Sequence, residues 1–71
     1  MRIKMTSLND KYNLIEQAEK LDGDVIISKG ATHLDGKSLL GVLNLDMSDG
    51  VNITYPKGAK EFESFLNRFK I

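Results

Sequence analysis

The sequence predicts a two-layer α+β domain, with helices on one face of a mostly antiparallel sheet. Segments of strand period and of helical period follow one another in the order β-α-β-β-α-β-α. A short turn separates the second and third strands, which is typical of an antiparallel hairpin. The helices are amphipathic, so each must pack one apolar face against another layer. At 71 residues, the chain is long enough for one modest core, and we expect residues 1–71 to form a single domain.

The first strand and first helix are predicted from residues 2–21. Residues 2–6 alternate apolar and polar, as a half-buried strand does. Ser7 or Asn9 can cap the helix, which we expect to continue to about Leu21, and Gly23 suits a left-handed helix terminus. The side chains expected to face the core from these two elements are Ile3, Met5, Leu14, Ile15, Ala18 and Leu21.

The remaining strands and the last helix have equally clear patterns. Residues 24–28 and 32–35 are expected to pair as a hairpin around a turn at 29–31. Residues 51–55 alternate again, and Pro56 ends that strand because it has no backbone donor for the ladder. The expected inward residues of this strand and the last helix are Val51, Ile53, Tyr55, Phe62, Phe65, Leu66 and Phe69.

Residues 35–45, DGKSLLGVLNL, contain a short apolar run directly behind a Lys-Ser pair. Ser38 is the expected N-cap of a helix of about two turns. Gly41 would permit close approach to the layer beneath. A short helix that is apolar on nearly every side cannot bury all of its side chains at the edge of a small domain, which suggests a contact surface. The alternative is that the whole run fills the core. On this helix Leu39, Leu40 and Leu43 share one flank, while Val42 and Leu45 lie toward another.

Composition excludes several classes of protein. The chain has no cysteine, so neither a disulfide framework nor a thiolate metal site is expected. Ten basic residues balance ten acidic ones without local concentration, which argues against direct nucleic-acid binding. No apolar run has the length of a signal peptide or a membrane span, so a soluble cytoplasmic protein without membrane contact is expected. Nothing in the sequence calls for a cofactor.

The segment THLDGKSLLGVLNLDMSDGVNITY, with the preceding DVIIS and the terminal amphipathic helix, resembles the HPr family. These are the histidine phosphocarriers of the bacterial phosphoenolpyruvate:sugar phosphotransferase system. The resemblance covers residues 24–71 and extends to the first helix. It implies an open-faced β-α-β-β-α-β-α sandwich with sheet order 1-4-2-3.

The chain departs from the family where the phosphoacceptor belongs. HPr proteins carry a Gly-x-His-x-Arg-Pro loop before the first helix, and the corresponding region here, MTSLNDKYNL, has no histidine, arginine or proline. Phosphoryl transfer through an imidazole needs that nitrogen and a positive group to hold the developing charge. We therefore expect no histidine carrier chemistry and no catalytic residue. In this the chain resembles the catabolite-repression HPr-like paralogue, which lacks the histidine and keeps a regulatory serine.

Ser38 matches the position of that serine, which a dedicated kinase phosphorylates in Gram-positive bacteria. A phosphate at a helix N-terminus gains from free N–H groups, and about two negative charges beside the leucines would alter docking. The alternative is that Ser38 is a helix cap and nothing more. The resemblance implies protein partners: an HPr-type serine kinase, a transcriptional regulator or a metabolic enzyme. We expect a monomer or weak dimer, with Lys37, Leu39, Leu40 and Leu43 as partner-binding residues.

Other candidate sites are weaker. Residues 30–38, GATHLDGKS, have five residues where a P-loop needs four. His33 is the one histidine and is expected on the less covered side of the sheet, where a lone histidine makes a poor metal site. Residues 46–50 have carboxylates at a calcium-like spacing without the final glutamate, so we expect a turn and no metal. Asp22 and Asp24 are expected to be turn and cap residues.

Two alternatives remain for the function. The chain could be a ferredoxin-like or ACT-type small-molecule sensing domain, whose β-α-β-β-α-β fold orders its strands 4-1-3-2. It could also remain an active phosphocarrier that uses His33. Strand order distinguishes the first of these alternatives from the HPr-like fold.

Overall fold

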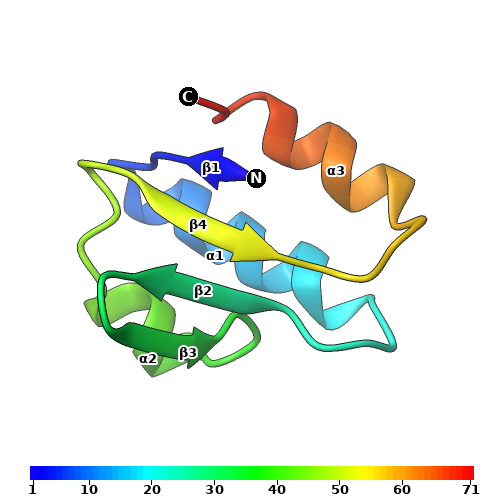
Figure 1. The fold of residues 1–71 in the computed structure, drawn as a ribbon, viewed down its shortest axis with the longest axis horizontal. Helices are drawn as coiled ribbons and strands as arrows, with labels where there is room; N and C mark the ends of the chain where they lie inside the picture. Colours follow the sequence, from blue (N-terminus) through cyan, green and yellow to red (C-terminus); the bar gives the residue numbers. More distant parts are fainter.

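A computed structural model describes residues 1–71 and has a four-stranded antiparallel sheet with three helices (Figure 1). The strand order is β1-β4-β2-β3, as expected from the HPr resemblance. This order rules out the ferredoxin-like alternative, which requires 4-1-3-2. The elements are β1 (Arg2–Ile3), α1 (Leu8–Glu19), β2 (Ile26–Lys29), β3 (Thr32–Asp35), α2 (Leu39–Asn44), β4 (Val51–Thr54) and α3 (Lys60–Asn67).

The sheet buries one face against the helices and leaves the other to solvent. In β4, Val51 and Ile53 are buried while Asn52 and Thr54 are exposed, which is the expected alternation of a half-buried strand. Figure 1 shows α1 and α2 behind the sheet and α3 on the side of β1. The thirteen residues of the core are Ile3, Met5, Leu14, Ile15, Ala18, Val25, Ile27, Val42, Met47, Val51, Ile53, Phe62 and Leu66.

The first strand is shorter than expected, although its inward residues are correct. Regular pairing covers Arg2↔Asn52 and Ile3↔Val51 only. The backbone then leaves β4, because the amide of Met5 donates to the carbonyl of Met47 at 3.1 Å. Met5 is still buried, with 2% of its surface exposed. The segment after Ile3 is therefore kept in place by the burial of Met5 in the core and not by pairing with β4.

The first helix begins at an expected cap but ends earlier than expected. Ser7 is the N-cap, and its Oγ accepts a hydrogen bond from the amide of Asp10 at 3.3 Å. The helix ends at Glu19, two residues before the expected end, and Leu21 is half-buried. The prediction for Gly23 is wrong, because its φ is not positive. A Cβ at Gly23 would lie 2.6 Å from Cγ of Pro56, so a close approach between two loops requires glycine there.

The hairpin and its turn agree with expectation apart from a shift of the first strand. β2 covers residues 26–29 where 24–28 was expected, and it pairs with β3 from Ile26↔Asp35 to Lys29↔Thr32. Gly30 has a φ of 58°. A positive φ at the first central residue is what a two-residue type II′ hairpin turn requires, and glycine adopts it without steric cost.

Candidate functional site

Ser38 lies at the N-terminus of α2 and caps that helix. Its backbone is extended (φ −84°, ψ 111°), and its Oγ accepts a hydrogen bond from the amide of Gly41 at 3.3 Å. The residue is half-buried, and the bond that its Oγ accepts lies in a partly buried position. A Cβ at Gly41 would lie 3.1 Å from this Oγ. Glycine at 41 therefore leaves room for the capping hydroxyl, and the expected role in approaching a deeper layer is wrong.

A tight turn delivers the chain from β3 to Ser38. The carboxylate of Asp35 accepts from the amide of Lys37 at 2.9 Å, and the carbonyl of Asp35 accepts from the amide of Ser38 at 3.0 Å. Gly36 is buried in this turn, where a Cβ would lie 2.6 Å from Cγ1 of Val25. Both ends of the turn are thus fixed, which positions the cap relative to the sheet.

The apolar residues of α2 divide between the core and the surface. Val42 is fully buried, while Leu39 is 47% and Leu40 is 72% exposed. Leu43 and Leu45 are half-buried. The interpretation of the entire run as core is therefore wrong, and an exposed apolar patch beside Ser38 is present.

Two lysines connect α1 and α2 at opposite ends. Lys11 of α1 donates through Nζ to the carbonyls of Leu45 at 2.6 Å and Leu43 at 3.5 Å, at the C-terminus of α2. Lys37, just before α2, donates through Nζ to the carbonyl of Leu21 at 2.7 Å, just after α1. The helices consequently run antiparallel. The ammonium of Lys37, an expected partner-binding residue, thus donates to a backbone oxygen, and the residue is half-buried.

Sequence reasoning missed two exposed apolar residues in the first half of α1. Leu8 is 57% and Tyr12 is 48% exposed, and they lie one helical turn apart, next to Lys11, which reaches α2. Their position outside the inward stripe of α1 was the available signal. Leu8 and Tyr12 lie at the end of α1 that faces the C-terminus of α2, whereas Leu39 and Leu40 begin α2.

The connection between β1 and α1 carries no imidazole. Ser7 occupies the N-cap of α1. His33 lies in β3 opposite Ser28 of β2, is exposed, and alternates with the half-buried Leu34. It therefore faces the uncovered side of the sheet, as expected, whereas α1 covers the other side.

Residues 46–50 form a hydrogen-bonded turn. The carboxylate of Asp46 accepts from the hydroxyl of Ser48 at 2.6 Å and from its amide at 3.0 Å, and these bonds together with the charge of Lys29 lower the pKa of Asp46 below 3.8. Lys29 also pairs with Asp49 at 3.0 Å. Asp46 thus bonds within its own turn and Asp49 pairs with Lys29 of β2. No group of three or more potential metal ligands forms anywhere in the molecule.

No helix of the structure is both long and apolar enough to span a lipid bilayer.

Comparison with solved structures shows the HPr fold over nearly the whole chain. Phosphocarrier protein HPr from Bacillus anthracis superimposes with a TM-score of 0.71 at 18% identity, over 99% of this chain and 94% of that one. Crh, the catabolite repression protein of Bacillus subtilis, forms an intertwined dimer with a swapped domain. It superimposes with a TM-score of 0.66 at 15% identity, over 100% of this chain and 88% of that one. A scan of protein-family models and a search of curated proteins found no match.

Proposed function

We propose that this protein is an HPr-like regulatory or interaction module that does not carry phosphate on histidine and that acts through the helix Ser38–Leu45. One observation carries the proposal. In a chain with the HPr fold, α2 exposes Leu39 and Leu40 directly behind a half-buried serine cap. Exposed leucines cost solvation free energy unless a partner covers them, so a protein-docking role accounts for them.

Phosphorylation of Ser38 would regulate docking through charge. The phosphate would lie at the N-terminus of α2, where amide groups and the helix dipole favour negative charge. Lys37, the residue before Ser38, donates to the carbonyl of Leu21 and keeps its positive charge, so it is a nearby counter-charge for the phosphate. About two negative charges would then lie beside Leu39 and Leu40 and disfavour an apolar or acidic partner.

Loss of histidine phosphotransfer is supported by the position of the remaining groups. Ser7 occupies the cap of α1, and a serine phosphate is too stable to act as a rapidly reversible carrier. His33 projects from the sheet face opposite to α1. A carrier reaction at His33 would need a donor enzyme that docks on that other face.

The proposed partners are an HPr-type serine kinase, a transcriptional regulator or a metabolic enzyme, in the cytoplasm of a bacterium. The likeness to Crh, a catabolite repression protein, supports this choice, as does the likeness to a phosphocarrier. We propose a monomer or weak dimer, with residues 1–71 as one domain.

The carrier question is tested with phosphoenolpyruvate and the first enzyme of the sugar phosphotransferase system. We expect no acid-labile label on this protein, while an HPr protein with its histidine is labelled in the same tube. Acid-labile label would contradict the proposal. If label appears and His33→Ala removes it, the protein is a phosphocarrier that uses His33.

The regulatory question is tested by mass spectrometry of the protein from its own cells grown on a preferred sugar. We expect phosphate on Ser38, and we expect an HPr-type serine kinase with ATP to modify the wild type and not Ser38→Ala. Repeated absence of phosphate under rich feeding would reduce Ser38 to a structural cap. Leu40→Ala should weaken binding to the regulator or enzyme that the unmodified protein binds.

A further inference from the structure

After α3 the chain runs beside β1, at the edge of the sheet (Figure 1). The amide of Lys4 donates to the carbonyl of Phe69 at 3.0 Å, and the amide of Ile71 donates to the carbonyl of Arg2 at 3.0 Å. This antiparallel pairing places Phe69 beside Lys4 and Ile71 beside Arg2. With Arg68, which precedes the paired segment, these residues form what we call the basic corner: Arg2, Lys4, Arg68, Phe69 and Ile71.

Side chains from the two paired segments and the end of α3 meet at the basic corner. A Cβ at Gly50 would lie 2.6 Å from Nη2 of Arg2 and 3.0 Å from Cδ1 of Ile71, so both side chains lie over the same glycine. The guanidinium of Arg68 lies over the ring of Phe69, with its Cζ 5.2 Å from the ring centroid. Ile71 is 56% exposed. Positive charge and exposed apolar surface therefore lie side by side.

The exposed cations of the basic corner have no carboxylate partner. The molecule's salt bridges within 4.0 Å all involve Lys29. The guanidinium of Arg2 donates to the backbone carbonyl of Asp49 at 3.3 Å, whereas the carboxylate of Asp49 pairs with Lys29 at 3.0 Å. The two chain ends flank Arg2 and carry opposite charges, so they offset each other. The fold thus gathers positive charge that is evenly distributed in the sequence.

We propose that the basic corner docks an acidic segment of a partner protein, in which Asp or Glu residues flank an aliphatic side chain. The carboxylates would accept hydrogen bonds from the guanidinium groups of Arg2 and Arg68 and from the ammonium of Lys4. The aliphatic side chain would cover Ile71. The corner lies at the β1 edge of the sheet, whereas α2 packs against β3 at the opposite edge. This second docking surface is therefore independent of Ser38.

The same observations disfavour nucleic acid and lipid as the ligand. Single-stranded nucleic acids stack their bases on free aromatic faces, but Arg68 already lies over the half-buried rings of Phe65 and Phe69. Anionic membranes are recognised by clusters of about four to eight basic residues, and this corner has three. Lys70 pairs with the buried Ile3, so its side chain leaves the segment on the other side.

The test is a titration of the intact ¹⁵N-labelled protein with the peptide Glu-Glu-Leu-Glu-Glu, acetylated and amidated at its ends, followed by amide chemical shifts. We expect saturable shifts at residues 2–4 and 68–71 that weaken as salt is added. Arg2→Gln and Arg68→Gln should each weaken binding by about twofold to fivefold, the range that an exposed charge pair provides. Both side chains are exposed, so the variants should fold. Arg68→Lys keeps the charge and should recover part of the affinity.

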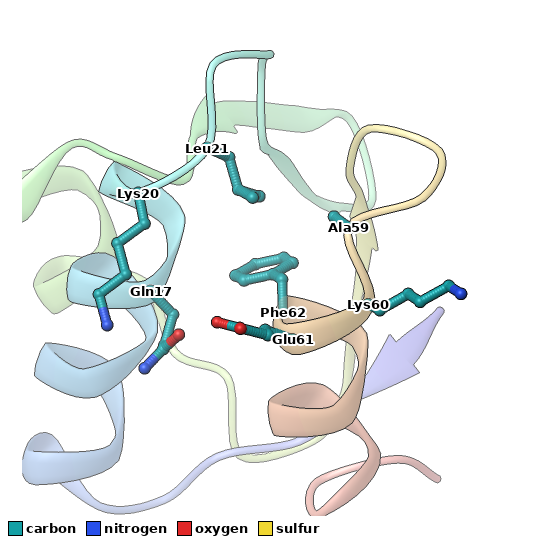
Figure 2. A pocket seen from close by; sticks show the side chains of 7 residues that line it. All are labelled: Gln17, Lys20, Leu21, Ala59, Lys60, Glu61 and Phe62. Atoms are coloured by element: carbon teal, nitrogen blue, oxygen red, sulfur yellow. The ribbon is translucent and has the colours of Figure 1, made fainter.

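Lys60→Gln is the matched control, because it removes one exposed cation from the other end of α3. Figure 2 shows the Lys60 side chain pointing away from the hollow between α1 and α3. Peptide binding to this variant should be unchanged. Three results would each overturn the proposal: equal binding of Gln-Gln-Leu-Gln-Gln, equal loss of affinity in Lys60→Gln and Arg68→Gln, or tighter binding of oligothymidine or phosphatidylserine vesicles at the same residues.

Discussion

Two substitutions in α2 test whether this helix divides its apolar residues between the core and the surface. Val42 is completely buried, and Leu40 is 72% exposed. Each is replaced by alanine, so the two variants change the same short helix in the same direction. If the division is right, Val42→Ala should unfold much more easily than Leu40→Ala.

The expected size of the difference follows from the exposures. Val42→Ala removes two buried methyl groups, about 1.6 kcal/mol at roughly 0.8 kcal/mol each, and the cavity adds to this loss. The better helix propensity of alanine returns at most about 0.5 kcal/mol, which leaves a net destabilisation of about 2 kcal/mol. Leu40→Ala removes atoms that are mostly in water already, so its change should stay within about 0.5 kcal/mol.

Urea denaturation measures both changes in the free energy of unfolding. A chain of 71 residues has a total stability of roughly 4–11 kcal/mol, so Val42→Ala should remain folded without denaturant. Its midpoint should fall with the slope unchanged, and its Tm should drop by about 8–16 °C. An equal loss in both variants would refute the division, because it would mean that Leu40 is buried in solution.

Three further predictions concern contacts around the sheet and helices. Lys11→Met should lower the free energy of unfolding by about 1 kcal/mol and speed amide exchange in α2, because it removes the charged donor at the C-terminus of that helix; unchanged exchange would contradict the contact. Ser38→Ala should cost about 1 kcal/mol through loss of the N-cap, and Ser38→Asp should recover most of that loss in denaturation experiments. The hydrogen bond that Tyr55 donates to Glu63 raises the pKa of Tyr55 above 10.0. Its contribution to stability is therefore present below pH 10.0 and lost as the pH rises through the raised pKa, so wild-type unfolding measured against pH should show a decline that Tyr55→Phe lacks.

The sequence was enough to predict the order of the elements and their buried faces, because the spacing of the apolar residues follows from which face of each element is buried. Val51 and Ile53 alternate with polar residues and face the core, and Phe62 and Leu66 recur at helical spacing and do the same. The predicted boundaries of the elements were less accurate where contacts between residues distant in sequence determine where an element ends. After Ile3 the backbone turns so that the amide of Met5 bonds to the carbonyl of Met47, 42 positions along the chain, and no local pattern signals that bond.

The glycines show the same limit. A Cβ at Gly23 is excluded by Pro56, and a Cβ at Gly36 is excluded by Val25. Local reasoning assigned Gly23 to a left-handed helix terminus because that is the commonest use of glycine after a helix. The actual cause is the approach of a loop more than thirty residues away in sequence, which only the folded chain reveals.

For the candidate site, the sequence indicated the cap and the leucines but not what holds the helix that carries them. A helix of six residues is too short to be stable by itself. Val42 anchors it to the core, and Lys11 and Lys37 fix its two ends to α1 through backbone carbonyls. Because so few side chains anchor α2, Leu39 and Leu40 are free to face outward. The exposure of these leucines beside Ser38 is thus a consequence of how the helix is held. Lys11, which the sequence alone does not distinguish from other charged surface residues, is one of the groups that hold it.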